Sequence, residues 1–157
     1  MPQPPDGVVN ALQTAVRLHL TAIDHYQSQA EHFGRWGYGK LAAAFAEDAE
    51  EERGHLKMAM SRLEYYDVAP EMAHPVPEWP RHDFEGVLSA NLALEDEVAG
   101  AERAAILVCR AAGDELSALV FVELLKGSEA SIAEIEATQR VIDQIGLDNY
   151  LADQVTA

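Results

Sequence analysis

Apolar residues spaced alternately four and three apart run through four long segments of the chain, and this pattern constrains the fold more than any other feature. Such spacing places the apolar side chains on one face of an α-helix, as is required where helices pack side by side. Glycine and proline crowd residues 1–7, 34–39 and 70–86 and are rare in the long stretches between. The pattern therefore predicts four long helices, separated where glycine and proline gather.

The helix boundaries follow from these breaks and from the capping residues beside them. Asp6 or Gly7 opens the first helix, and Asp148 caps a short last one. Gly113 and Asp114 form a short turn between the third and fourth helices. The expected helices cover about 8–33, 40–66, 82–112, 115–146 and 149–155.

The connection at 70–86 is too long for a tight turn and can run the full length of a bundle. The second and third helices would then be parallel, which is the connectivity of ferritin-like bundles. We therefore predict an all-α fold, a ferritin-like four-helix bundle with one long crossover loop and a short fifth helix. Residues 1–157 would form a single domain, with a flexible leader at 1–7 and the fifth helix within 147–155.

The chain is strongly acidic, with 27 Asp and Glu against 11 Lys and Arg and a formal net charge of −16. This balance argues against nucleic acid or an anionic membrane as a partner, whereas solubility and metal handling explain it equally well. The apolar runs are far shorter than the roughly 20 residues that span a bilayer. With no secretory signal and a single cysteine, Cys109, the expected location is the cytoplasm.

Polar residues interrupt each apolar stripe near the middle of its helix, which predicts polar groups meeting at one level inside the bundle. Glu52 and His55 lie three residues apart on the second stripe, while His19 and Glu95 lie on the first and third. Burying an ionised carboxylate costs several kcal/mol unless a cation or hydrogen bonds compensate. Two imidazoles and two carboxylates suit Fe(II), Zn(II), Mn(II) or Co(II). The alternative is an internal salt-bridge network of the same residues.

Other polar residues near this level receive separate interpretations. Tyr26, seven residues after His19, is placed to hydrogen-bond a ligand carboxylate, unless it simply packs in the core. Glu102 is expected to pair with Arg62, because the second and third helices would be parallel. Four further histidines fall off the stripes or in loops and are expected at the surface: His25, His32, His74 and His82.

Several short segments along the chain match the pattern of a known family: Val9-Asn10, Ala22-Ile23, Tyr26, Trp36-Gly37, Glu52-x-x-His55, Pro70, Leu92-Ala-Leu-Glu95 and Ile145-Gly-Leu-x-Asn-Tyr-Leu151. Through these segments the chain resembles the bacterioferritins from Val8 to about Gln154. The resemblance implies a subunit that associates into dimers and a hollow 24-subunit shell storing oxidised iron, with haem at two-fold interfaces and Asn149 at a four-fold channel.

The resemblance implies a di-iron centre made of a Glu on the first helix, Glu-x-x-His on the second, Glu on the third and Glu-x-x-His on the fourth. Ser128 and Ser131 stand at the two fourth-helix positions of this chain. They supply neither the imidazole nor the bridging carboxylate of the second iron position. We therefore expect paired-iron oxidation to be absent or much slowed. We also expect one ion per chain, bound by His19, Glu52, His55 and Glu95, with iron expected and zinc or manganese not excluded. The six positions hold His19, Glu52, His55, Glu95, Ser128 and Ser131.

Haem binding is expected to be lost. The family's axial methionine directly follows the Glu of the second-helix motif, and Arg53 stands there. A guanidinium stays protonated and does not donate to iron. Met60 is one heptad further, about 10 Å along the helix, which is far from the axial position.

The function expected from these features is a bacterioferritin-like iron-storage or shell subunit with an incomplete ferroxidase centre. Acidic residues such as Glu47 and Glu51 would collect iron, and a catalytically complete sister subunit would oxidise it. One alternative is a mononuclear metal-binding protein that uses the 2-His/2-Glu site. Another is a metal-free structural cage protein with a salt-bridged core.

Overall fold

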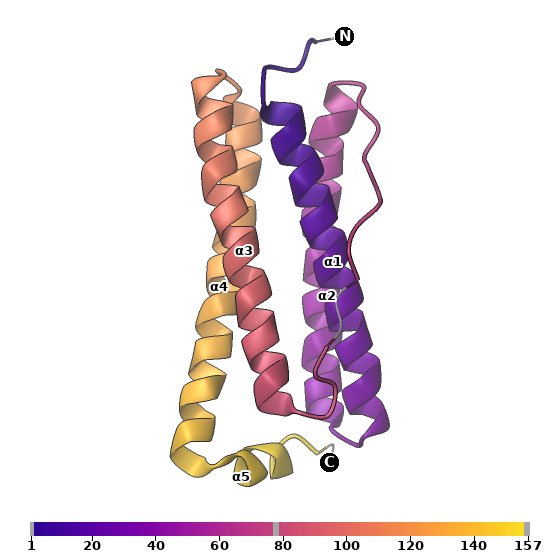
Figure 1. Ribbon diagram of the computed structural model, residues 1–157, viewed down its shortest axis with the longest axis vertical. Helices are drawn as coiled ribbons and strands as arrows, with labels where there is room; N and C mark the ends of the chain where they lie inside the picture. Colours follow the sequence, from indigo (N-terminus) through magenta and orange to yellow (C-terminus); the bar gives the residue numbers. More distant parts are fainter. Residues whose placement is uncertain (1, 77–78, 156–157) are drawn as a thin grey trace.

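The computed structural model describes residues 2–76 and 79–155, and no strand occurs in these two ranges (Figure 1). Met1 of the predicted leader and residues 77 and 78 of the predicted connection lie outside the described residues. The helices are α1 (Val8–Arg35), α2 (Gly39–Tyr65), α3 (Phe84–Ala111), α4 (Glu115–Ile145) and α5 (Leu147–Ala152).

The long helices form two antiparallel pairs, α1 with α2 and α3 with α4, which lie side by side, and α5 turns across one end (Figure 1). The connection after α2 returns along the outside of the first pair, so that α2 and α3 run parallel. They lie diagonally across the bundle, whereas α1 packs against α3 and α2 against α4. The predicted all-α bundle with one long crossover and a short last helix is confirmed.

Hydrogen bonds hold the crossover connection against α1. Gln13 Nε2 donates to the carbonyl oxygen of Ala69 at 2.9 Å, and Thr21 Oγ1 donates to that of Pro75 at 3.3 Å. The connection therefore covers a second side of α1, in addition to the side that faces the other helices. None of the helices within the described ranges has the length and apolar content that crossing a membrane requires.

The ends of the helices agree with the capping residues, except at α5. Asp83 caps α3 by accepting from Gly86 N at 3.0 Å, and Asp114 caps α4 by accepting from Ser117 N at 3.1 Å. The prediction that Asp148 caps the last helix was wrong. Gly146 has a φ of 86°, which ends α4 and lets α5 begin at once with Leu147. Helix α5 ends at Ala152.

The core consists of two apolar clusters with a polar layer between them. The mid-helix interruptions of the apolar stripes therefore do meet inside the bundle, as predicted. The first cluster includes Val8, Leu12, Val16, Leu63, Phe121 and Leu124. The second includes Phe33, Phe45, Phe84, Leu88 and Ile142. The buried side chains of the polar layer include His19, Glu52, Glu95, Glu102 and Ser128.

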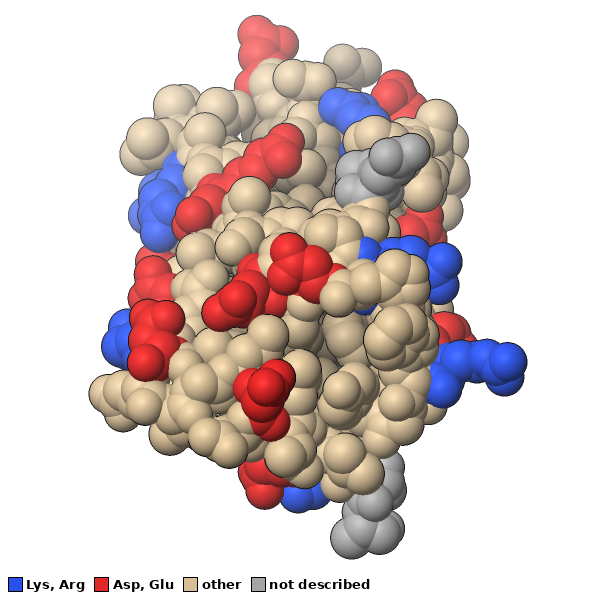
Figure 2. All heavy atoms as spheres, turned by 60° about the horizontal axis from the view of Figure 1, so that its bottom comes forward, with Lys and Arg blue, Asp and Glu red and all other residues tan. Residues whose placement is uncertain are grey.

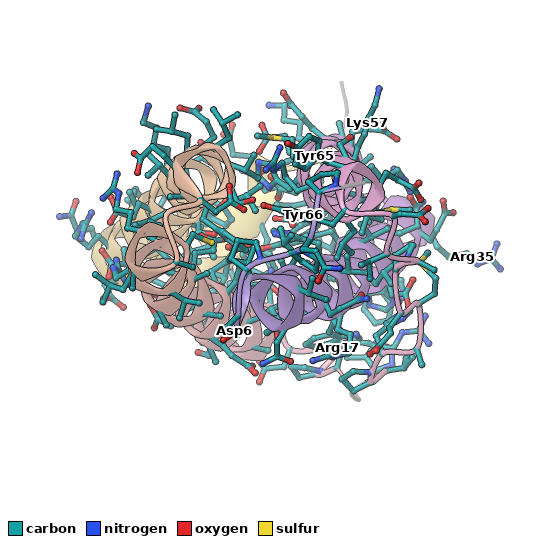
Figure 3. The ribbon with its side chains drawn as sticks, turned by 90° about the horizontal axis from the view of Figure 1, so that it is seen from above. Asp6, Arg17, Arg35, Lys57, Tyr65 and Tyr66 are labelled. Atoms are coloured by element: carbon teal, nitrogen blue, oxygen red, sulfur yellow. The ribbon has the colours of Figure 1, made fainter. Side chains whose placement is uncertain are left out.

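The expected pairing of Glu102 with Arg62 was wrong. Arg62 Nε donates to Ser117 Oγ at 2.9 Å and Arg62 Nη2 to Asp114 Oδ1 at 3.2 Å, near the end of the bundle where Tyr66 also bonds Asp114 (Figure 3). The parallel orientation of α2 and α3 was correct, but the two helices are diagonal and are not neighbours. Glu102 instead faces α1 and α4.

Candidate metal centre

His19 on α1 and Glu52 and His55 on α2 form a compact cluster in the polar layer. One ligand atom from each residue lies within 4.8 Å of the other two. His19 Nδ1 lies 2.6 Å from Glu52 Oε2, and His55 Nδ1 lies 3.7 Å from the same oxygen. His19 and Glu52 are buried and His55 is half-buried. Three of the four predicted ligands are thus brought together.

Glu95, the fourth predicted ligand, lies outside this three-residue cluster. Its side chain is buried, and Tyr26 Oη donates to Glu95 Oε1 at 2.6 Å. Burial and the nearby charge of Glu52 raise the pKa of Glu95 to about 8. A hydrogen bond between Tyr26 and a predicted ligand carboxylate is one of the two roles considered for that tyrosine.

Glu102 is a buried acidic residue of the centre that the sequence interpretation had assigned to Arg62. Its Oε1 accepts a hydrogen bond from Ser128 Oγ at 3.1 Å and lies 3.8 Å from His19 Nε2. Burial raises the pKa of Glu102 to about 7. Spacing could have indicated this position: seven residues separate Tyr26 from His19, and seven separate Glu95 from Glu102. Because α1 and α3 are antiparallel, His19 lies level with Glu102 where Tyr26 lies level with Glu95.

The protein stabilises only one of these three carboxylates in its charged form. Burial opposes the ionisation of Glu52, but the hydrogen bond from His19 and the nearby imidazole of His55 outweigh it and hold the pKa of Glu52 at about 2. The same interaction raises the pKa of His55 above its usual value. Glu95 and Glu102 have no such partner, so without a further cation they hold their protons near neutral pH.

Four buried side-chain atoms of the centre have no hydrogen-bond partner among the described residues. Buried polar atoms are nearly always bonded, and orphaned ones call for an explanation such as a bound ion. Two imidazole nitrogens and two carboxylate oxygens are ligand atoms for a divalent transition metal. The residues present therefore fit a metal ion. The four atoms are His19 Nε2, His55 Nδ1, Glu95 Oε2 and Glu102 Oε2.

The sequence profile of the family described as "Ferritin-like domain" matches residues 9–145 of the chain. The chain belongs to this family. It is 30% identical over 150 residues to a bacterial ferritin of Neisseria meningitidis serogroup A, covering 95% of this chain and 97% of the relative. It is 27% identical over 143 residues to a bacterioferritin of Brucella melitensis (91% and 89%) and 26% identical over 153 residues to one of Mycobacterium avium (95% and 94%). The resemblance identified in the sequence is confirmed.

At the two α4 positions where bacterioferritins are expected to carry Glu and His, this ferritin-like chain has serines in different surroundings. Ser128 is buried and committed to Glu102. Ser131 is half-buried and lines a pocket of about 120 Å³ to which all five helices contribute, together with Asp48 and Glu134. Burial and neighbouring acidic groups raise the pKa of Asp48 to about 7.

The lack of a side chain at Gly127 on α4 leaves room for the His55 ring. A Cβ on Gly127 would lie 2.7 Å from His55 Cε1, closer than packed atoms allow. We expect Gly127→Ala to displace the imidazole and weaken divalent-metal binding by about tenfold or more, a loss within the range that a misplaced ligand causes. Isothermal titration with Co(II) would measure this.

Gly100→Ala is the matched control for that substitution. Gly100 is an exposed helical glycine on α3, and its added Cβ would meet nothing within 4 Å. We expect Gly100→Ala to bind Co(II) as the wild type does and to gain up to about 1 kcal/mol of stability from helix propensity. Unchanged binding by Gly127→Ala would show that the His55 ring is free to move aside.

Two of the four histidines expected at the surface are buried, so that expectation was wrong for His25 and His32. His25 Nε2 is hydrogen-bonded to Asn91, and burial lowers the pKa of His25 to about 3. The physical reason is the crossover connection, which covers a face of α1 that the apolar stripe does not mark. His82 is exposed as predicted, and His74 is half-buried, with Nε2 2.6 Å from Asp24 Oδ2.

Arg53 stands at the position where the family is expected to carry its axial haem methionine, and Asn149 stands at the expected channel position. Arg53 is bonded to Glu50 and donates from Nη2 to Gln27 Oε1 at 2.9 Å. Its guanidinium is thus held by neighbouring side chains on the outside of the α1–α2 pair. Asn149 is exposed and donates to the carbonyl oxygen of Ile145 at 2.6 Å.

Proposed function

We propose that this chain is the iron-storage subunit of a bacterioferritin-like shell, with an incomplete paired-iron centre that holds one metal ion per chain. The names of its relatives, bacterioferritin and bacterial ferritin, support iron storage. The observation that carries the proposal is the buried His19–Glu52–His55 cluster with its unpartnered ligand atoms. Glu95, which also has an unpartnered oxygen, is the fourth proposed ligand.

Oxidation of iron would fall to a second kind of subunit. A two-metal centre needs both ions held close together by shared ligands. Ser128 and Ser131 supply neither a carboxylate nor an imidazole, and the hydroxyl of Ser128 is already bonded to Glu102. The chain therefore binds and stores iron, while a catalytically complete sister subunit in the same assembly oxidises it.

The acidic surface supports a role in collecting cations. Glu47 and Glu51 on α2 are exposed, and the net charge is −16. Acidic side chains are spread over the middle of the face shown in Figure 2, whereas Lys and Arg lie towards its edges. A field of one sign concentrates counter-ions near the surface. Iron arriving as Fe(II) is a cation that such a surface attracts.

The proposal includes dimers and a 24-subunit shell in the cytoplasm, with Asn149 at a channel. It includes no haem at the Arg53 position, because the guanidinium is positively charged and already paired with Glu50. A second function, a mononuclear metal protein outside any shell, would use the same cluster. The size of the purified assembly and the chains that co-purify with it separate these two functions.

The decisive experiment is an anaerobic Fe(II) titration of the purified protein, with bound ions counted by elemental analysis. We expect one tightly bound ion per chain, and His55→Ala should weaken binding by about 100-fold or more, since it removes a ligand outright. His82→Ala, at an exposed histidine, is the matched control and should bind as the wild type does. Two tight ions per chain, or none, would contradict the proposal.

A further inference from the structure

We infer that Glu102 is a ligand of this metal centre, supplying from α3 the carboxylate that position 128 no longer supplies from α4. The inference rests on the proposed function, since it extends the same centre. It assigns a chemical role to a residue that the family pattern does not include. The ligand set then draws on α1, α2 and α3, while α4 orients it through Ser128.

The ionised form of Glu102, which is the form that binds metal, requires a cation beside it. Glu102 is 2% exposed and lies in the interior between α1, α3 and α4. The nearby arginines are engaged elsewhere, Arg62 with Asp114 and Arg103 with Glu129. An ionised carboxylate in such a place costs several kcal/mol unless a cation or strong hydrogen bonds offset it. One oxygen, Oε2, has no hydrogen-bond partner at all.

The orientation of His19 leaves a ligand atom facing Glu102. A carboxylate accepts hydrogen bonds, so His19 Nδ1 donates to Glu52 and Nε2 is the ring nitrogen left to face Glu102. A histidine held by a carboxylate through one nitrogen typically binds metal through the other. His19 Nε2 has no hydrogen-bond partner and lies 3.8 Å from Glu102 Oε1. That separation is too long for a hydrogen bond.

The same distance suits two ligands of one ion. Ligand atoms that each lie about 2.0–2.2 Å from a shared metal are separated from one another by about 3–4 Å. The 3.8 Å between His19 and Glu102 falls in this range, as does the 3.7 Å between His55 Nδ1 and Glu52 Oε2. These two separations are therefore too long for hydrogen bonds and fit ligand atoms that share one ion.

Ser128 fixes the Glu102 carboxylate in this position. Its hydroxyl donates to Glu102 Oε1 at 3.1 Å across the α3–α4 contact, and both side chains are buried. A serine is short enough to leave room for the Glu102 side chain. A glutamate at position 128 would need that same space. The Glu102 carboxylate and a carboxylate at position 128 would thus compete for the same space.

Co(II) binding to the full-length protein tests the inference, followed anaerobically by calorimetry and by visible absorption, which reports the ligand set of Co(II). We expect Glu102→Gln to weaken Co(II) binding by about 10–100-fold and to alter the absorption bands. Ser128→Ala, which frees the carboxylate without removing it, should weaken binding by about tenfold or less. Glu97→Gln removes an exposed carboxylate from the same helix and should match the wild type.

The outcomes separate this inference from the proposed function. If the wild type binds no Co(II), the proposed function fails. If the wild type binds Co(II) and Glu102→Gln binds with the same affinity and the same absorption, Glu102 is not a ligand, while the proposed function stands. Should Glu102→Gln not fold, Glu102→Asp decides in its place, because it keeps the charge but withdraws the carboxylate by one methylene. It should show the same loss, and unchanged affinity and absorption would overturn the inference.

Discussion

A variant of this chain that regains the family's ligand pattern should oxidise Fe(II) in a fast phase that the wild type lacks. The changes are His19→Glu, Ser128→Glu and Ser131→His, with Glu102→Ala to clear space. With about two Fe(II) per chain, stopped-flow absorbance should show initial oxidation at least about 100-fold faster than in the wild type. The reason is that paired metal ions act together on oxygen only when both are held by shared ligands.

The structure explains why four changes are needed. Ser128 Oγ lies 3.1 Å from Glu102 Oε1, so a longer side chain at position 128 requires the space that Glu102 fills. Position 131 faces a pocket of about 120 Å³ and can accept an imidazole without displacing the core. Position 19 is buried, and a glutamate there must bind metal to offset its burial.

The control is the same variant with Ser131→Ala in place of Ser131→His. It restores the carboxylates but not the second imidazole, and its initial rate should remain close to that of the wild type. A fast phase in the wild type would show that an unrecognised ligand completes the pair. Equal rates in both variants would show that the imidazole at position 131 has no part in the oxidation.

The helices and their connectivity could be predicted because both depend on local sequence. Apolar spacing marks the buried face of each helix, and the length of the 70–86 connection decides that α2 and α3 are parallel. Which helices are neighbours is decided by packing, and the pattern does not contain it. For this reason Glu102 was assigned to Arg62 on the diagonal helix, although it contacts Ser128 and lies beside His19.

The candidate site was predictable to a similar extent. His19, Glu52 and His55 come together because each lies at the middle of an apolar stripe. The burial of His25 and His32 could not be read from α1 alone, since it depends on how the crossover connection lies on that helix. Sequence periodicity thus locates residues that face other helices, and it misses those covered by a loop.

A second large effect concerns the pH dependence of stability in the metal-free protein, which should fall as the pH rises from about 6.5 to 8.5. The pKa of Glu95 is raised from 4.5 to about 8 and that of Glu102 to about 7. In this window the folded state binds protons that the unfolded chain has released, so the free energy of unfolding decreases with pH. The raised pKa of His55 acts in the same direction. His25, with a pKa lowered to about 3, opposes this trend only below about 6.5.

Glu95→Gln should remove much of this fall. The amide oxygen can still accept from Tyr26, and no charge is buried at high pH. We expect the metal-free variant to exceed the wild type by about 2–4 kcal/mol at pH 8.5, with little difference near pH 5, where Glu95 is protonated in the folded state. Urea unfolding followed by circular dichroism would measure this after chelation, with Glu97→Gln as the control. Parallel pH curves for wild type and Glu95→Gln would contradict the shifted titration.

Metal should change the sign of this pH dependence. A divalent ion compensates the carboxylates that are costly to ionise without it, and it competes with protons for the same ligand atoms. Binding to the folded state alone adds stability that grows with the ratio of free metal to its dissociation constant. With Co(II) present, stability should therefore hold or rise between about pH 6.5 and 8.5, where the metal-free protein weakens. The same buried carboxylates that destabilise the empty bundle thus become the source of its affinity for metal.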